Sequence, residues 1–133
     1  MPDYPPPFKL KVELVGFPFK IVRKVLVPRE VLMFDLHMII QGAMGWTNTH
    51  LYEFLDQQPK GKIRVGVPSD YDLEYEEMGF PALRDAQKVH FKDVFYKENK
   101  GKSFWYNYDV GDDWQHRLTF QKVTDKENQN YFG

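Results

Sequence analysis

Apolar and polar residues alternate along several short segments of this chain, with the period of two that is typical of β-strands buried on one face. Near the N-terminus, for example, Phe8, Leu10 and Val12 alternate with Lys9 and Lys11. The alternation breaks around residue 23, and a β-bulge there would explain the break. Strands are therefore predicted over five ranges: 8–14, 19–27, 50–55, 104–108 and 114–121.

The segment 29–44 has the spacing of an amphipathic α-helix, because its apolar residues recur every three to four positions. Pro28 suits the start of a helix, and Gly45 is placed to end it. Gln41 falls off the apolar stripe and, as a polar side chain, is poor core material. The stripe comprises Leu32, Leu36, Ile39, Ile40 and Ala43, with Met33, His37 and Met44 beside it.

The remaining segments have weaker patterns. Between residues 57 and 87 only a short strand over 63–67 stands out, and 89–96 combines a strand end with one helical turn. The polar C-terminal tail is expected to fray. We therefore predict one domain over residues 1–133, with an ordered core of about 8–123. Its fold class is α+β, with a mostly antiparallel sheet backed by one main helix and shorter helical turns in two layers.

Composition and charge limit the partners and the cellular location that we expect for the protein. The 133 residues carry a net charge of −1, which argues against a strong sequence-independent hold on nucleic acid. There is no cysteine, so neither a disulfide framework nor a thiolate ligand is available. The N-terminus lacks the regions of a signal peptide, and no apolar run approaches the roughly 18 residues of a membrane-spanning helix. We therefore expect a cytoplasmic protein that makes no membrane contact.

The side chains best suited to metal binding or proton transfer cluster at the turn between the last two predicted strands. Asp109, Asp112 and Asp113 surround Gly111 there, and His116 follows on the next strand. Carboxylates with an imidazole could bind a divalent metal ion, or act as an acid–base pair near neutral pH. Alternatively, the aspartates satisfy the turn, Gly111 adopts a positive φ, and His116 hydrogen-bonds Asp112 or Asp113 inside the core.

Two further histidines could approach this hairpin. His37 lies on the predicted helix and His50 opens a predicted strand, so both could meet His116 if the helix covers that face. Three imidazoles would make a credible metal site, although no H-x-x-x-H spacing is present. The alternative is that they are interior histidines bonded to the backbone, and the residues predict no cofactor. Trp114 is predicted to be largely buried and to anchor the hairpin.

Two charged runs could each bind a ligand or simply face solvent. An acidic run could hold calcium, but it lacks the glycine and the ligand spacing of an EF-hand loop, and a solvated loop or strand edge is the simpler interpretation. A basic strand face could bind single-stranded nucleic acid, or be an ordinary solvated face. The acidic run is Asp70, Asp72, Glu74 and Glu76, and the basic face is Lys9, Lys11, Lys20, Arg23 and Lys24.

Phe34 and Met38 form a second apolar pair on the predicted helix. They are four residues apart, so they touch on the helix surface away from the main stripe. The pair is either covered by the loop over 57–87 or open to a protein partner or a second copy of the chain.

Several blocks along the chain together match a known family pattern. The supporting blocks are Leu10–Leu14, Val27–Pro28, Leu36–His37, Ile40–Gln41, Gly45–Trp46, and His50 with Phe54; the specific block is Tyr108–His116. Over about residues 8–123 the chain resembles the plasmid pRiA4b ORF-3-like proteins of bacteria and archaea. It departs from them at Val22, where members usually carry tryptophan, and after the hairpin, where members commonly continue into a further segment.

The resemblance implies an α+β fold, a setting on plasmids or other mobile elements, and no established activity. Some members carry a resolvase-type name, but neither Ser69 nor Ser103 lies in the arginine-rich context that a serine recombinase needs. We therefore expect a non-enzymatic binding or interaction module. The alternatives are a metal-dependent or acid–base enzyme that uses the aspartate–histidine hairpin, and a nucleic-acid accessory protein.

Overall fold

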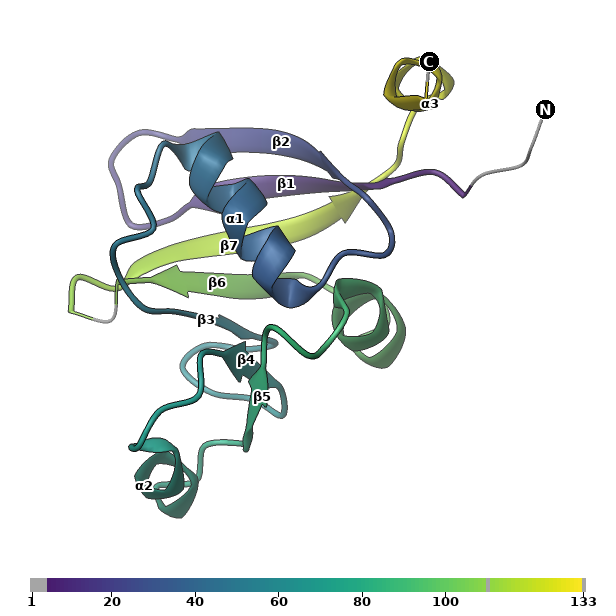
Figure 1. Ribbon diagram of the computed structural model, residues 1–133. Helices are drawn as coiled ribbons and strands as arrows, with labels where there is room; N and C mark the ends of the chain where they lie inside the picture. The colour runs from purple at the N-terminus through teal and green to yellow at the C-terminus, as the bar shows by residue number, and fades with distance from the viewer. Residues whose placement is uncertain (1–4, 110, 133) are drawn as a thin grey trace.

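Seven strands and four helices make up the part of the chain that the computed structural model describes, residues 5–109 and 111–132. The strands are β1 (Phe8–Leu14), β2 (Ile21–Val27), β3 (Tyr52–Leu55), β4 (Arg64–Gly66), β5 (Leu83–Asp85), β6 (Phe104–Tyr108) and β7 (Trp114–Gln121). The helices are α1 (Met33–Met44), α2 (Asp72–Glu77), the π-helix η1 (Lys92–Glu98) and α3 (Asp125–Phe132). The strands form one sheet in the order β2-β1-β7-β6-β3-β4-β5 (Figure 1).

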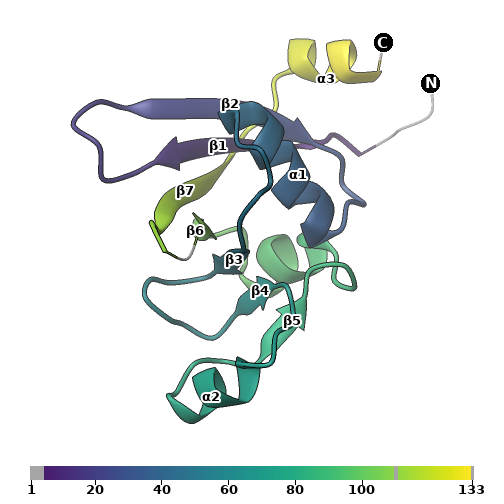
Figure 2. The same ribbon diagram turned by 60° about the vertical axis from the view of Figure 1, so that its left-hand side comes forward.

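The core lies between one face of this sheet and the helices α1 and η1 (Figures 1 and 2). Side chains alternate between buried and half-buried along β1, as the hydrophobic pattern predicted. Every neighbouring pair of strands is antiparallel except β4 and β5. The predicted fold class, α+β with a mostly antiparallel sheet backed by helices, is therefore confirmed.

β2 forms one edge of the sheet and is more regular than its sequence indicated. Its pairing with β1 runs one to one from Phe8 opposite Val27 to Leu14 opposite Ile21, so the predicted bulge is wrong. Arg23 lies opposite Val12, yet it is exposed because this edge strand reaches beyond the covered core. The alternation breaks at Arg23 for that reason, and its guanidinium donates to the Val22 carbonyl oxygen.

Helix α1 begins at Met33, four residues later than the sequence predicted. Leu32 is extended, with ψ 160°, and it forms a β-bridge with His90. The Leu32 N–H then donates to the carboxylate of Asp35 at 2.9 Å, which caps the first turn. The helix ends as predicted at a left-handed glycine, Gly45, with φ 77°.

The buried face of α1 is rotated from the predicted stripe. It consists of Met33, Leu36, His37, Ile40 and Gln41. Gln41, which the sequence indicated as poor core material, is only 2% exposed. Gln41 is tolerated in the core because both the nitrogen and the oxygen of its side-chain amide are hydrogen-bonded, as described below.

The weakly patterned middle and the polar tail are structured. Three residues of the acidic run, from Asp72 on, lie in the helix α2, and the Asp72 carboxylate accepts hydrogen bonds from the N–H and the hydroxyl of Ser69. The tail, which was expected to fray, forms the helix α3 beside the start of β1 (Figures 1 and 2). Lys9 on β1 holds Glu127 of that helix at 2.9 Å.

Candidate functional site

Three connections meet at one end of the sheet: the β1–β2 turn, the α1–β3 loop and the β6–β7 hairpin turn (Figure 1). A cleft of about 230 Å³ lies between the last two. Residues of three blocks that carry the family resemblance, namely Gly45–Trp46, the block that begins at His50, and the hairpin block, therefore meet at this cleft, although they are far apart in sequence. The cleft is lined by Gly45, Trp46, Thr47, Thr49, His50, Tyr108, Asp109, Asp112 and Trp114.

A closed ring of hydrogen bonds fixes the α1–β3 loop on this end of the sheet. The Tyr106 hydroxyl donates to Nδ1 of His37 at 2.6 Å and accepts from the Gln41 amide at 2.8 Å. Nε2 of His37 donates to the Asn48 side-chain oxygen at 2.6 Å, and the Asn48 N–H donates to Gln41 Oε1 at 2.8 Å. Because the amide oxygen of Asn48 can only accept, the His37 proton lies on Nε2.

His37, Gln41 and Tyr106 of this ring are buried, whereas Asn48 is exposed, and burial shifts the pKa values of His37 and Tyr106. Desolvation lowers the pKa of His37 below its ordinary value, although the hydrogen bond to Asn48 acts in the opposite direction. Desolvation likewise raises the pKa of Tyr106. Both groups are therefore neutral near pH 7. The His37 ring also stacks on the Tyr52 ring, with 3.6 Å between the ring centroids.

His116 is a core residue held by a second pair of hydrogen bonds. It is fully buried, its Nδ1 donates to the Tyr106 carbonyl oxygen at 3.1 Å, and its Nε2 accepts from the Trp46 indole at 3.2 Å. The predicted hydrogen bond from His116 to Asp112 or Asp113 is therefore wrong. Desolvation lowers the pKa of His116, which keeps it neutral. Both ring nitrogens are occupied, so the arrangement offers no free acid or base at this position.

The aspartates of the hairpin build the turn and leave one carboxylate free. Asp109 accepts hydrogen bonds from the N–H groups of Gly111 and Asp112, while Asp113 accepts one from the Gln115 amide. Positive φ occurs at Asp109 (64°) and Asp113 (53°). The φ of Gly111 depends on residue 110, which lies outside the described residues. Asp112 is exposed, and its carboxylate has no hydrogen-bond partner in the described chain.

The three candidate histidines do not meet. His37 and His116 lie on two sides of Tyr106, whereas His50 has an exposed side chain whose Nε2 lies 3.6 Å from the Asp109 carboxylate. Among residues 5–109 and 111–132, no group of three or more histidine, aspartate or glutamate side chains is close enough to hold a metal ion. The predicted metal and acid–base roles of these residues stay predictions without a supporting geometry.

A row of aromatic rings runs across this end of the sheet. Trp114 is half-buried, not largely buried as predicted, because its ring lies at the rim between Phe17 and Trp46. Phe17 stacks on Trp114 at 5.3 Å and 11°, and neighbouring rings along the row are 5.3–5.9 Å apart, within the range of favourable ring pairs. In order, the aromatic row is Phe19, Phe17, Trp114, Trp46, Tyr108 and His50.

Sequence reasoning missed part of this row. Phe17 lies between the first two predicted strands and Phe19 begins the second, and nothing in their spacing indicates that they approach Trp114. Trp46 enters the sequence analysis only as part of a family block. The available signal was the concentration of aromatic residues beside turns, since large rings at loop positions must pack on something.

The other predicted sites are dispersed. Phe34 is half-buried and packs against the core, and its backbone N–H donates to the Ala86 carbonyl oxygen of the 57–87 segment. Met38 is 42% exposed.

The five basic residues do not share one face, because Lys11 pairs with Lys24 on the open face while Arg23 points to the opposite side. Lys9 and Lys11 are also within ion-pair distance of Glu127 and Glu13.

The fold and the site define an α+β protein with a one-sided antiparallel sheet and an aromatic cleft at its hairpin end. A family model described as plasmid pRiA4b ORF-3-like protein matches residues 7–132. The chain therefore belongs to the plasmid pRiA4b ORF-3-like family, as the sequence blocks indicated. None of the described helices has the length and apolar character needed to cross a membrane.

Two relatives align with most of this chain. The uncharacterized protein y4hQ of Sinorhizobium fredii is 35% identical over 115 residues, which is 86% of this chain and 53% of the relative. A crystal structure of a protein of unknown function from Methanosarcina mazei matches with a TM-score of 0.69 and 30% identity, covering 87% of this chain and 60% of that one. The chain thus spans about half the length of the curated relative, and these relatives have no established function.

Proposed function

We propose that this protein is a non-enzymatic binding module that holds a basic segment of a partner polypeptide at the aromatic row. One observation carries the proposal: neighbouring indole and phenol rings, tilted against one another, share a cleft with the carboxylates of Asp109 and Asp112. Lysine and arginine side chains are attracted both to the faces of such rings and to carboxylates. The combination favours a cation over a neutral or anionic ligand.

The charges around the cleft support a cationic occupant. No lysine or arginine is among the described residues that line it. The side chain of Asp109 is only 17% exposed, so its charge is screened less than that of a fully solvated carboxylate. A basic side chain that enters would therefore meet two acidic groups and no competing cation.

The size of the cleft indicates a side chain, not a cofactor. Its volume of about 230 Å³ is below the roughly 300–1,000 Å³ of typical small-molecule sites. Phe17 and Phe19 are 37% and 61% exposed, and they continue the row beyond the cleft. A peptide could place one basic residue in the cleft and lay apolar neighbours on these two rings.

The cellular setting is a proposal from the family name alone. A plasmid or mobile-element context and a cytoplasmic location are consistent with a small binding module that acts on another protein. Because the chain spans only part of its relatives' length, the partner of the whole protein is equally a proposal.

The test is a set of peptides in which one arginine or lysine is flanked by apolar residues, with glutamine as the neutral counterpart. Binding is measured by indole fluorescence. We expect the basic peptides to bind at least about tenfold more tightly than the neutral one. Trp114→Leu and Asp112→Asn should each weaken this binding.

Two matched variants control for general effects. Trp105→Leu changes another half-buried tryptophan, and Asp70→Asn removes another exposed carboxylate, both outside the cleft. These variants should bind as the unmodified protein does. Equal binding of basic and neutral peptides, or equal losses in all four variants, would refute the proposal.

A further inference from the structure

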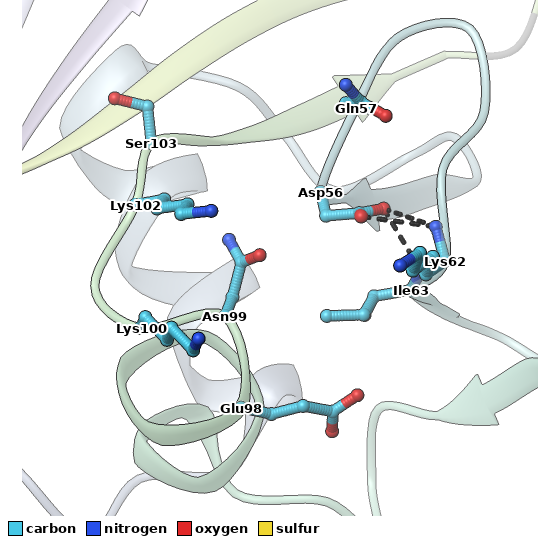
Figure 3. Close-up of a pocket in the computed structure, with 9 residues that line it drawn as sticks. All are labelled: Asp56, Gln57, Lys62, Ile63, Glu98, Asn99, Lys100, Lys102 and Ser103. Atoms are coloured by element: carbon cyan, nitrogen blue, oxygen red, sulfur yellow. Dashed lines mark hydrogen bonds between the residues drawn. The ribbon is translucent and has the colours of Figure 1, made fainter.

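A second, larger cleft lies at the opposite end of β6 from the hairpin. It has a volume of about 370 Å³ and opens between the loop after β3 and the segment that joins η1 to β6 (Figure 3). Its volume falls within the range of small-molecule sites. None of its lining residues belongs to the aromatic row, so the two clefts are independent sites. The lining residues are Asp56, Gln57, Lys62, Ile63, Glu98, Asn99, Lys100, Lys102 and Ser103.

Three lysines surround this cleft, and their ammonium groups have no acidic partner. Lys100 and Lys102 approach from the η1–β6 segment and Lys62 from the facing loop (Figure 3). In the described chain none of the three forms an ion pair, whereas Lys9, Lys92 and other lysines do. Unpaired lysines are common on protein surfaces, but three that line one cleft concentrate positive charge at one point.

The two carboxylates of the cleft do not neutralise this charge. Both oxygens of Glu98 are taken by the guanidinium of Arg84, at 2.6 and 2.7 Å. Asp56 accepts hydrogen bonds from the backbone N–H groups of Lys62 and Ile63, which directs its carboxylate into its own loop (Figure 3). With Glu98 balanced by Arg84, three lysines against Asp56 leave two unbalanced positive charges.

A buried donor without a partner lies between the lysines. The side-chain nitrogen of Asn99 is inaccessible to solvent, and within the described residues it makes no hydrogen bond. Figure 3 shows its amide in the space between Lys102 and Ile63. A buried polar group in this situation is normally satisfied by water or by a ligand. Ser103 also lines the cleft at its rim, and within the described residues its hydroxyl lies 3.4 Å from the Thr119 hydroxyl.

We propose that this cleft binds the phosphate group of a small organic phosphate monoester. A monoester phosphate carries up to two negative charges and three terminal oxygens, which match two unbalanced charges and several lysine and amide donors. A carboxylate has half that charge and two oxygens, so it satisfies fewer of these donors. The remaining volume of the cleft accommodates the organic part of the ligand.

The experiment follows backbone amide signals of Gly101 and Ser103 by nuclear magnetic resonance at constant ionic strength. The probes are inorganic phosphate, ribose 5-phosphate, acetate, and a short single-stranded oligonucleotide without a terminal phosphate. We expect saturable shifts with the first two, and at least about tenfold weaker binding of acetate. The double variant Lys62→Gln with Lys102→Gln should weaken phosphate binding at least about tenfold.

The matched control is Lys20→Gln with Lys24→Gln, which removes the same charge from exposed lysines outside the cleft. Its phosphate affinity should stay within about twofold of the unmodified protein. If the cleft variant does not fold, as judged by thermal melting, Lys102→Gln alone takes its place. Absence of saturation by either phosphate, equal losses in cleft and control variants, or equally tight binding of the oligonucleotide would overturn the proposal.

Discussion

Trp46 donates its indole N–H to Nε2 of His116 across 3.2 Å, and this bond joins the α1–β3 loop to strand β7. The two residues are 70 positions apart in sequence. Their rings meet edge to face, with centroids 6.2 Å apart. The bond thereby fixes the floor of the aromatic cleft, because it holds the central ring of the aromatic row against a fully buried partner.

Replacing Trp46 by phenylalanine should destabilise the protein through this bond. Trp46→Phe leaves Nε2 of His116 buried without a donor, and a buried unsatisfied group costs about 1–3 kcal/mol. The measurement is the free energy of unfolding in guanidinium chloride. Trp105→Phe is the control, because no hydrogen bond of the Trp105 side chain occurs in the described residues, and it should cost less than Trp46→Phe. Equal costs would show that the indole bond does not contribute.

Tyr106 and Tyr108 lie on the same strand but should respond differently to loss of the hydroxyl. Tyr106→Phe leaves Nδ1 of His37 and the side-chain nitrogen of Gln41 without a partner in the core, so we expect a loss of about 2–4 kcal/mol. Tyr108→Phe removes one acceptor of the Thr49 N–H near the surface, so we expect about 0.5–1.5 kcal/mol. Thermal and denaturant unfolding measure both, and a larger loss for Tyr108→Phe would contradict the hydrogen-bonded ring.

Stability should fall as the pH drops below about 6.5. Burial lowers the pKa of both His37 and His116 below 6.5, whereas the unfolded chain regains the ordinary value. The unfolded state therefore binds more protons in this range, and the free energy of unfolding falls by up to about 2.7 kcal/mol per pH unit for the two groups. This contribution is fully present above pH 6.5 and is lost toward the folded pKa values.

Urea unfolding between pH 7.5 and 5.5 measures this dependence. His116→Gln should remove about half of the slope, since one of the two buried imidazoles is gone. A slope that is absent from the unmodified protein, or unchanged in the variant, would show that His116 is not held neutral by the fold.

Phe34 and Met38 separate into a core residue and a surface residue. Phe34→Ser should cost at least about 2 kcal/mol, because the ring packs against the core. Met38→Ser should change stability by no more than about 0.5 kcal/mol. Sedimentation of the Met38 variant then tests whether this exposed side chain mediates self-association, and unchanged association would remove Met38 from the candidate interface.

The strands that were predictable from sequence are those with one buried face. β1 and β6 lie inside the sheet, where each core-facing residue is buried and each neighbour is half-buried, so local alternation reports the structure directly. β5 has three residues and pairs in parallel with β4 through contacts that are distant in sequence. Such a strand leaves no periodic signal of its own.

The site was less predictable, because its key residues depend on partners far away in sequence. Gln41 is polar and therefore excluded from a core by pattern alone, yet Tyr106 and Asn48 satisfy it inside. Leu32 is extended only because His90 pairs with it, which delays the start of α1. His116 was expected to find a carboxylate close by in the hairpin, but its partner is an indole from another loop.

The charges that interrupt the alternation of β2 also affect whether two copies of this protein can pair along their sheet edges. β2 ends the sheet, so in the described chain its outer backbone is a template on which another strand could add. Lys20, Arg23 and Lys24 are exposed along this edge. Two copies that approach edge to edge would bring these like charges together, and salt weakens that repulsion as the screening length falls to about 3 Å at 1 M. The charges that make this edge irregular in sequence thus disfavour pairing between the β2 edges of two copies.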